Sequence, residues 1–343
     1  METLDLDQTA RAIVADGKGV LAADETAPTI GKRFAARAIE STADSRRAYR
    51  EMLFSTPGIS QFIGGVILQD ETIRQNASDG TPLVELVANQ GMLPGIKVDA
   101  GAKPLAGSPG ELVTEGLDGL RERLMTYRQI GARFAKWRAV IRIGQGLPTS
   151  TCIESNAAAL ARYAALCQEQ DLVPIVEPEV LMDGAHTIDR CAEVTEGVLS
   201  AVFDALFAQR VRLEATLLKP SMVIAGSGCA RQATIPEVAA ATLRTLNRHV
   251  PPAVPAIVFL SGGQDHLRAT EHLNAINQCD ARKPWILSFS FARALQDEAM
   301  ETWRGRSENV AAAQRAFYHR ARCDSAAATG RYASALEDEL API

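Results

Sequence analysis

Short apolar runs recur along the chain and alternate with segments of helical periodicity. Each run is rich in valine, isoleucine, leucine or phenylalanine and is bounded by glycine, proline or polar residues. Most of the runs are therefore predicted to be buried parallel strands. They cover residues 19–25, 62–69, 94–101, 133–141, 173–180, 214–220, 256–263 and 284–293.

Helical patterns lie between these runs, for example at 156–170, 190–209 and 236–249. The third is preceded by a capping box, Thr234-Ile-Pro-Glu237, with proline in the first turn. A strand followed by a helix, repeated about eight times over roughly 300 residues, predicts an α/β fold of the (β/α)8 TIM barrel type. An open doubly wound sheet is the alternative. No strand is followed by a GxGxxG turn, and the nearest candidate, at 226–231, lacks its third glycine.

The chain contains no low-complexity linker and no fixed-period repeat, and its glycines and prolines are spread throughout. We therefore expect a single domain over 1–343, with a C-terminal tail at about 325–343.

Composition and charge exclude several classes of function. Of the 343 residues, 47% are hydrophobic and 22% charged, which allows a large core. The net charge of -5 gives no basic field for nucleic acid or acidic membranes. The N-terminus does not resemble a secretory signal and no apolar run approaches bilayer length, so a cytoplasmic protein is expected. The six cysteines form no CxxC pair and the five histidines no HExxH motif, so neither a metal nor another cofactor is predicted.

Polar residues gather where the predicted strands end, which is where a barrel of this kind carries its chemistry. Three of the groups are i, i+2 pairs, whose members point to the same face of a strand. Salt-bridged filler is one explanation, but burying so many charges costs several kcal/mol per ion unless they are paired. A functional cluster is the better explanation. Its members are Asp24 and Glu25, Lys97 and Asp99, Lys136 and Arg138, Glu177 and Glu179, Lys219, Ser261, Gly262 and Gly263, and Ser290 and Arg293.

Lys219 ends the apolar run LEATLL. A lysine at a strand end can extend to the surface, which is the simple alternative. In water only about one lysine in 2,500 is neutral at pH 7, so a nucleophilic lysine needs a lowered pKa. Burial and a second cation lower the pKa, and Lys136 is placed to be that cation. With Glu177 and Glu179 to move protons, this arrangement suits Schiff-base chemistry on a carbonyl compound.

The last two strands indicate a phosphorylated substrate. Ser261-Gly-Gly-Gln264 and Arg293 lie where barrels commonly bind phosphate. Without that location, Gly-Gly could be only a tight turn. A second basic group follows the first strand and could bind another phosphate, although a solvated helix face is the alternative. It comprises Thr26, Thr29, Lys32, Arg33 and, further on, Arg46.

With these residues in place, the chain resembles the class I, Schiff-base-forming fructose-bisphosphate aldolases. The matching motifs cover nearly the whole sequence. They are GKGVLAADET (17–26), GGVILQDET (64–72), GIKVDAG (95–101), PLAG (104–107), GLDGLRER (116–123), FAKWRAVI (134–141), LVPIVEPEVLMDG (172–184), LEATLLKPSM (213–222), VFLSGGQ (258–264) and LNAINQC (273–279). The resemblance implies a (β/α)8 barrel, usually a homotetramer. It also implies reversible, metal-independent cleavage of fructose 1,6-bisphosphate to dihydroxyacetone phosphate and glyceraldehyde 3-phosphate.

The resemblance also implies a role for each matching residue. Lys219 would be the Schiff-base lysine, Glu177 the general acid/base, with Glu179 supporting it. Asp24 would handle the substrate hydroxyl at the bond to be cleaved. Lys136 would be the cation beside the nucleophile. The residues expected to contact substrate or its phosphates are Lys97, Arg138, Thr26, Thr29, Lys32, Arg33, Arg46, Ser261, Gly262, Gly263, Ser290, Ala292 and Arg293.

The chain departs from the family pattern in three places. Thr26 and Thr29 stand where serines are common, and Phe291-Ala292 where tyrosine and glycine are frequent. Many animal members end in a tyrosine that helps to protonate the enamine carbon, whereas this chain ends at Ile343. Tyr332 is too far from the end to be matched to it, so the donor of that proton is open.

Two other functions would be compatible with some of these residues. A transaldolase-type Schiff-base barrel would share the lysine chemistry, but phosphate groups at both ends of the substrate argue against it. A non-catalytic scaffold with the same fold would have no reason to combine Lys219, Glu177, Lys136 and Asp24.

Overall fold

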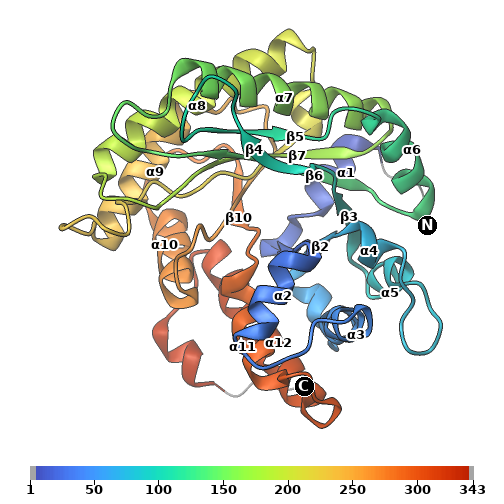
Figure 1. Ribbon diagram of the computed structural model, residues 1–343. Coiled ribbons are helices and arrows are strands. Elements are labelled where there is room, and N and C mark those ends of the chain that lie inside the picture. The colour runs from blue at the N-terminus through green and yellow to red at the C-terminus, as the bar shows by residue number, and fades with distance from the viewer. Residues whose placement is uncertain (1–4, 340–343) are drawn as a thin grey trace.

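The computed structural model describes residues 5–339. Its main sheet is a barrel of parallel strands in the order β1-β2-β3-β6-β7-β8-β9-β10 (Figure 1). The edge strands approach each other, and the Ala22 N–H donates to the Phe291 carbonyl at 3.1 Å. The barrel, rather than the open doubly wound sheet, is confirmed. The strands are β1 (Gly19–Ala22), β2 (Ile63–Leu68), β3 (Leu93–Lys97), β6 (Phe134–Ile141), β7 (Val173–Val180), β8 (Leu217–Leu218), β9 (Ala256–Phe259) and β10 (Ile286–Phe289).

Helices surround the barrel, with α7 and α8 across one side of the view and α2, α3, α11 and α12 on the other (Figure 1). The three helical patterns singled out in the sequence all form helices. Thr234 and Glu237 make the expected reciprocal capping bonds. The helices are α1 (Leu6–Ala12), α2 (Ala27–Ala35), α3 (Ala43–Phe54), α4 (Asp70–Ile73), α5 (Leu83–Asn89), α6 (Leu120–Ile130), α7 (Ser150–Glu169), α8 (Ile188–Ala208), α9 (Ile235–His249), α10 (His266–Gln278), α11 (Arg293–Trp303) and α12 (Val310–Ala328).

Every predicted strand forms, but the run at 214–220 gives only the two residues of β8. Its first half folds instead as a 3-10 turn, Leu213–Ala215. At its other end Pro220 has no N–H to continue the ladder. The Lys219 N–H still donates to the Val176 carbonyl at 2.8 Å, so the backbone of Lys219 remains attached to β7. A small antiparallel hairpin, β4 (Gly101–Pro104) with β5 (Leu112–Glu115), lies outside the barrel sheet and was not expected.

The lower half of the barrel interior is apolar. Phe134, Ile175 and Leu217, from three adjacent strands, belong to one buried cluster with Ile13 and Val14, which follow α1. The chain after α1 therefore closes the N-terminal end of the barrel. The contact requires glycine at position 64, because a Cβ there would lie 2.1 Å from the Ile13 carbonyl oxygen.

The C-terminal segment packs against the barrel helices. Helix α12 includes residues 325–328, so the chain beyond the last helix begins at Thr329. Tyr332 is buried, and a 3-10 turn spans Ser334–Asp338. Residues 340–343 of the expected tail lie outside the described part of the chain.

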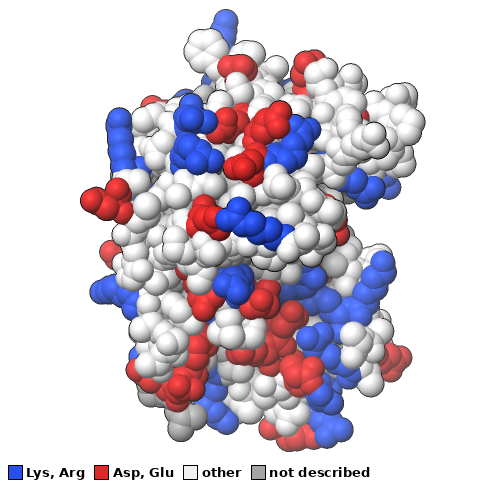
Figure 2. Space-filling view, turned by 90° about the vertical axis from the view of Figure 1, so that its left-hand side faces the viewer, with Lys and Arg blue, Asp and Glu red and all other residues white. Residues whose placement is uncertain are grey.

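The surface carries both signs of charge. Figure 2 shows basic and acidic side chains interspersed over one face of the molecule. Among residues 5–339, no helix combines the length and the apolar character needed to cross a membrane.

Candidate active site

The strand alternation that fills the lower barrel with apolar side chains places charged ones directly above them. On β6 the inward row continues from Phe134 to Lys136 and Arg138, and on β7 it continues from Ile175 to Glu177 and Glu179. These side chains line a cavity of about 450 Å³ at the C-terminal ends of the strands. The i, i+2 pairs at the ends of β6 and β7, together with Lys97, therefore converge on one cavity.

The cavity brings together nearly all of the predicted site residues. Its lining includes Asp24, Thr26, Thr29, Lys32, Arg33, Lys97, Lys136, Arg138, Glu177, Glu179, Lys219, Ser261, Gly262, Gly263, Ser290, Ala292 and Arg293. Arg46 does not belong to this lining. Its Nε donates to Glu71 Oε2 at 2.7 Å, so its guanidinium is occupied outside the cavity.

Lys219 lies inside the barrel mouth and does not extend to the surface. The residue is only 3% exposed, and its Nζ lies 3.4 Å from Glu177 Oε1. Burial lowers the pKa of Lys219, and the positive charge of Lys136 adds to this effect, while Glu177 opposes it. The net result favours the neutral amine, which is the form that attacks a carbonyl.

Lys136 is the hub of the charged groups. Its Nζ lies 2.6 Å from Asp24 Oδ2 and 3.3 Å from Glu177 Oε2. Burial would lower the pKa of Lys136, but the two carboxylates outweigh burial and raise it, so Lys136 stays charged. The pKa of Asp24 responds in the opposite direction. Burial would raise it, yet Lys136 and Lys219 bring it down to about 2. Asp24 is therefore an ionised carboxylate, able to accept a proton only when a substrate changes its surroundings.

Glu177 lies between the two lysines, with one carboxylate oxygen facing each. A group in this position can pass a proton between the Lys219 amine and an oxygen leaving the same carbon.

The flanking pairs hold their side chains in fixed orientations. Arg138 Nε contacts Glu179, and burial of this guanidinium is offset by the carboxylate, so the pKa of Arg138 is raised. Lys97 Nζ donates to Asp99 Oδ1 at 2.6 Å and to the Asp99 carbonyl at 2.8 Å. Asp99 also accepts from the Gly101 N–H at 3.1 Å, which orients its carboxylate. These pairs place two further cations at the wall of the cavity.

The loop between β9 and α10 has a conformation that only its glycines adopt easily. Gly262 and Gly263 have φ of 60° and 94°. A Cβ on Gly263 would also lie 2.9 Å from the Met182 sulfur. Arg293 begins α11 and lines the same cavity as this loop.

Ser290 and Arg293 have unused hydrogen-bonding capacity toward this part of the cavity. The Ser290 hydroxyl is buried and has no protein partner in the part of the chain that the structure describes. Within residues 5–339, no carboxylate pairs with Arg293. An anion with several oxygens, such as phosphate, would satisfy both groups.

The cations of the second basic group differ in whether they form ion pairs. Arg33 contacts Glu25 and its NH2 lies 3.0 Å from Asp297 Oδ1, so its charge is already balanced. Lys32 is exposed at the rim and, among the described residues, has no ion-pair partner. The hydroxyls of Thr26 and Thr29 lie 3.0 Å apart. Lys32 is therefore the cation of this group that is free to meet a substrate.

The sequence does not indicate which residues hold the chain at the C-terminal end of β1 in place. Glu25 was noted but given no role, and it pairs with both Arg33 and Arg50. Gln296 is fully buried, and its Nε2 donates to the Ala22 carbonyl at 2.7 Å. Its Oε1 accepts from the Tyr49 hydroxyl at 3.1 Å. Arg50 and Gln296 lie within patterns of ordinary helices, so the sequence contains no signal for this role.

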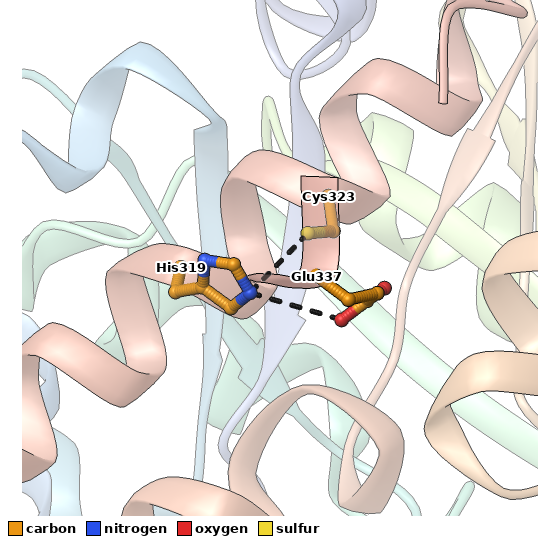
Figure 3. A group of neighbouring side chains, drawn as sticks. All are labelled: His319, Cys323 and Glu337. Atoms are coloured by element: carbon orange, nitrogen blue, oxygen red, sulfur yellow. Dashed lines mark hydrogen bonds and ion pairs between the residues drawn. The ribbon is translucent and has the colours of Figure 1, made fainter. Parts of the chain in front are cut away.

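One group of possible metal ligands lies on α12, outside the cavity lining. Figure 3 shows His319 and Cys323 one turn apart, with Glu337 reaching them from the C-terminal segment. The Glu337 carboxylate is already occupied, since Arg320 donates to its two oxygens at 2.7 and 2.9 Å. Burial raises the pKa of Cys323 to about 12, so its thiol stays protonated. A cation here would compete with a guanidinium and a proton, and the cluster fits an ion-pair role better than a metal site.

Comparisons with known proteins agree with this geometry. A family model described as fructose-bisphosphate aldolase class-I matches residues 5–341. A probable fructose-bisphosphate aldolase class 1 of Xanthomonas campestris pv. campestris is 56% identical over 97% of this chain and 99% of its own length. The cytosolic fructose-bisphosphate aldolase 6 of Arabidopsis thaliana is 55% identical over 96% of this chain and 91% of its own.

A solved structure gives the same result for the fold. The fructose-bisphosphate aldolase of Plasmodium falciparum, crystallised with TRAP and a small-molecule inhibitor, aligns with a TM-score of 0.94 and 49% identity. The alignment covers 96% of this chain and 95% of that one. With a family model over nearly its full length and relatives above half identity, the chain belongs to the class I fructose-bisphosphate aldolase family.

Proposed function

We propose that this member of the aldolase family cleaves fructose 1,6-bisphosphate reversibly through a Schiff base on Lys219. The observation that carries the proposal is the buried Lys219 amine, 3.4 Å from Glu177 and with its pKa lowered by burial and by Lys136. The products are dihydroxyacetone phosphate and glyceraldehyde 3-phosphate.

In the first stage, the neutral Lys219 amine attacks the ketone carbon, and one proton of the nitrogen passes to the former carbonyl oxygen, giving a carbinolamine. Glu177 then supplies the proton with which the hydroxyl leaves as water, and a protonated imine remains. Glu177 suits the role of proton donor because one of its carboxylate oxygens faces Lys219 and the other faces Lys136.

In the second stage, a carboxylate removes the proton of the hydroxyl two carbons from the imine. The bond that joins the hydroxyl-bearing carbon to the carbon next to the imine then breaks. The aldehyde leaves, and the electron pair of this bond moves toward the imine nitrogen to give an enamine. Asp24 is our candidate for this base, because its pKa of about 2 keeps it ionised at the edge of the same cavity. Protonation of the enamine carbon and hydrolysis of the imine then release the ketone and restore Lys219.

Two groups of side chains are proposed to hold the phosphates. Ser261, Gly262, Gly263, Ser290 and Arg293, with the Ala292 N–H, would bind one of them. Among residues 5–339, Arg293 has no carboxylate partner and the buried Ser290 hydroxyl has no hydrogen-bond partner, which supports this assignment. Lys32, Thr26 and Thr29 would contact the other phosphate, with Arg33, Lys97 and Arg138 in the cavity wall. The Glu71 pairing of Arg46 makes a direct contact by that residue the weakest of the sequence predictions.

We also propose a cytoplasmic homotetramer, which rests on the family resemblance. The side chain of Phe207 near the end of α8 is 85% exposed, as expected of an apolar residue that a neighbouring subunit covers. Light scattering coupled to gel filtration tests the oligomeric state, and a monomer or dimer at micromolar concentration would contradict the tetramer.

Covalent trapping tests the central proposal. Incubation with dihydroxyacetone phosphate and borohydride should add mass to the Lys219 peptide, and Lys219→Arg should abolish both the adduct and turnover. An unmodified Lys219 peptide with full activity would overturn the proposal, whereas an unmodified peptide with no turnover would favour a non-catalytic scaffold. A coupled assay with fructose 1,6-bisphosphate in the presence of EDTA then separates an aldolase from a transaldolase-type enzyme, which needs an acceptor sugar.

A further inference from the structure

His272 lies on the buried face of α10 and contacts the glycine loop that lines the cavity. The side chain is 4% exposed, and its Nδ1 lies 2.6 Å from Gln264 Oε1. Gln264 is the last residue of the sequence Ser261-Gly-Gly-Gln264, so His272 contacts this loop through Gln264, and His272 itself does not line the catalytic cavity.

The hydrogen bonds around Gln264 fix which atoms donate. Its Nε2 donates to the Ser261 carbonyl at 3.1 Å, and that carbonyl also accepts the Gln264 N–H at 3.0 Å. The amide cannot be turned over, because its oxygen would then face the Ser261 carbonyl. Gln264 Oε1 is thus an acceptor, and His272 must donate its Nδ1 proton to it.

The loop needs such support, since its own backbone is held in an uncommon conformation. Gly262 and Gly263 both have positive φ, and glycine is the residue with the greatest freedom to leave that region. The two bonds from Gln264 to the Ser261 carbonyl close this turn. His272 in turn fixes the rotamer of Gln264.

We infer that His272 is a positioning residue for substrate binding, which acts through Gln264 to hold the Ser261–Gly263 loop in the shape that binds a substrate phosphate. This inference rests on the proposed phosphate site at that loop. It adds a residue that does not line the catalytic cavity and that carries no proton in the reaction.

The test compares three substitutions that differ in where they place a donor. In His272→Asn the side-chain amide N–H can occupy the place of Nδ1, so the bond to Gln264 is retained. His272→Gln is polar but places its amide further out, and His272→Leu fills the space without a donor. Steady-state kinetics with fructose 1,6-bisphosphate and thermal unfolding are measured for each.

We expect His272→Leu and His272→Gln to raise KM about tenfold while kcat stays within about twofold, and His272→Asn to keep KM within about twofold of the parent. Equal KM values for the Leu, Gln and Asn variants would overturn the inference. If His272→Leu does not fold, the comparison of Gln with Asn decides the matter, because both are polar amides. A parallel fall of kcat and melting temperature in all three would indicate a purely structural role and also contradict the inference.

Arg293→Ala separates this inference from the proposed phosphate site. If Arg293→Ala raises KM strongly and the His272 variants do not, the phosphate site stands and the role of His272 is wrong. If Arg293→Ala leaves KM unchanged, the phosphate site itself is misplaced.

Discussion

Lys136 controls the charge state of the cavity, because it is the cation shared by Asp24 and Glu177 and the neighbour that disfavours a proton on Lys219. The neutral fraction of Lys219 grows as pH rises through its pKa. The rate of imine formation must therefore rise with pH over the same interval.

Lys136→Met should shift this rise to higher pH and slow imine formation at pH 7 by at least about tenfold. Without the ammonium, burial still disfavours a charged Lys219, but the two carboxylates are left to favour it. The rate of cyanoborohydride trapping with dihydroxyacetone phosphate, measured from pH 5 to 10, gives the midpoint. Lys136→Arg retains the charge and serves as the control. Superimposable profiles for Lys136→Met and the parent would contradict the explanation.

We expect Tyr332 to have a structural role and no role in catalysis. Its hydroxyl donates to Glu337 Oε1 at 2.7 Å, and the residue does not belong to the lining of the catalytic cavity. Tyr332→Phe should leave cleavage within about twofold and cost about 1 kcal/mol of unfolding free energy through the lost hydrogen bond. Cleavage assays and chemical denaturation check the two effects. A loss of cleavage above about a hundredfold, near 2.7 kcal/mol of activation free energy, would mean that Tyr332 takes part in the chemistry.

At the scale of elements, the floor of the barrel depends on the approach of β2 to the chain after α1. Gly64→Ala should destabilise the protein by about 3 kcal/mol, because its Cβ would meet a backbone carbonyl that cannot move aside alone. Gly197→Ala is the matched control. Gly197 lies within α8 and a Cβ there meets no atom within 4 Å, so this change should stabilise by about 0.5–1 kcal/mol. Urea denaturation compares the two, and equal effects would refute the packing argument.

Two carboxylates of the C-terminal segment pair with arginines of α12, Glu339 with Arg322 and Glu337 with Arg320. Glu337 accepts from Arg320, which is 1% exposed, and from Tyr332. Glu337→Gln should cost about 2 kcal/mol, since it leaves a buried guanidinium with a neutral partner. Thermal unfolding of Glu337→Gln and of the double variant with Arg320→Met tests the coupling. Additive effects in the double variant would show that the pair is not coupled.

The eight strands could be predicted because each apolar run is short and buried on both faces, as a parallel barrel requires. The cavity could be predicted because alternation along a strand places Lys136 with Arg138, and Glu177 with Glu179, on one face. The length of β8 could not, since it depends on a 3-10 turn at Leu213–Ala215 that competes with the strand. Arg46 is predicted to contact substrate but does not belong to the cavity lining, and the sequence gives no sign that Glu71 pairs with it.

The supporting residues could not be predicted for a related reason. Gln296 acts through its hydrogen bond to the Ala22 carbonyl and His272 through its bond to Gln264, and nothing in a helical pattern marks which polar residue will face inward. Such residues become visible only when their partners are in place.

For the whole molecule, two buried groups set opposite responses to acid. Burial raises the pKa of Asp324 from 3.8 to about 7 and lowers the pKa of His272 from 6.5 to about 4. The geometry agrees for Asp324. The Thr270 hydroxyl has one proton for two acceptors, the His266 carbonyl at 2.8 Å and Asp324 Oδ1 at 2.6 Å, so it cannot stabilise a charged carboxylate fully.

The signs follow from proton counting. Between about pH 4 and 7 the folded chain keeps the Asp324 proton that the unfolded chain has released, so this stabilisation is lost as pH rises through 7. Between about pH 4 and 6.5 His272 is protonated in the unfolded chain and neutral in the folded chain. The free energy of unfolding therefore decreases as pH falls through that window. Each effect is worth roughly 3–4 kcal/mol, and over the shared window the two largely cancel.

Single substitutions should therefore reveal each response. Asp324→Asn should make the unfolding free energy rise with pH between about 4 and 6.5, and His272→Asn should make it fall with pH between about 4 and 7. Denaturation curves at half-unit steps of pH provide the measurement. Identical pH slopes for the parent and both variants would contradict the two assignments.

The closure of the barrel floor by the first helix bears on how the molecule is made. Ile13 and Val14 pack against Phe134, Ile175 and Leu217, and Asp7 of α1 pairs with Arg212 at 2.6 Å. A ribosome delivers α1 before these strands, and the last of its partners, Arg212 and Leu217, emerge only some two hundred residues after α1. Helix α1 must then wait without its final contacts, and the barrel can acquire its complete floor only after β8 has been synthesised.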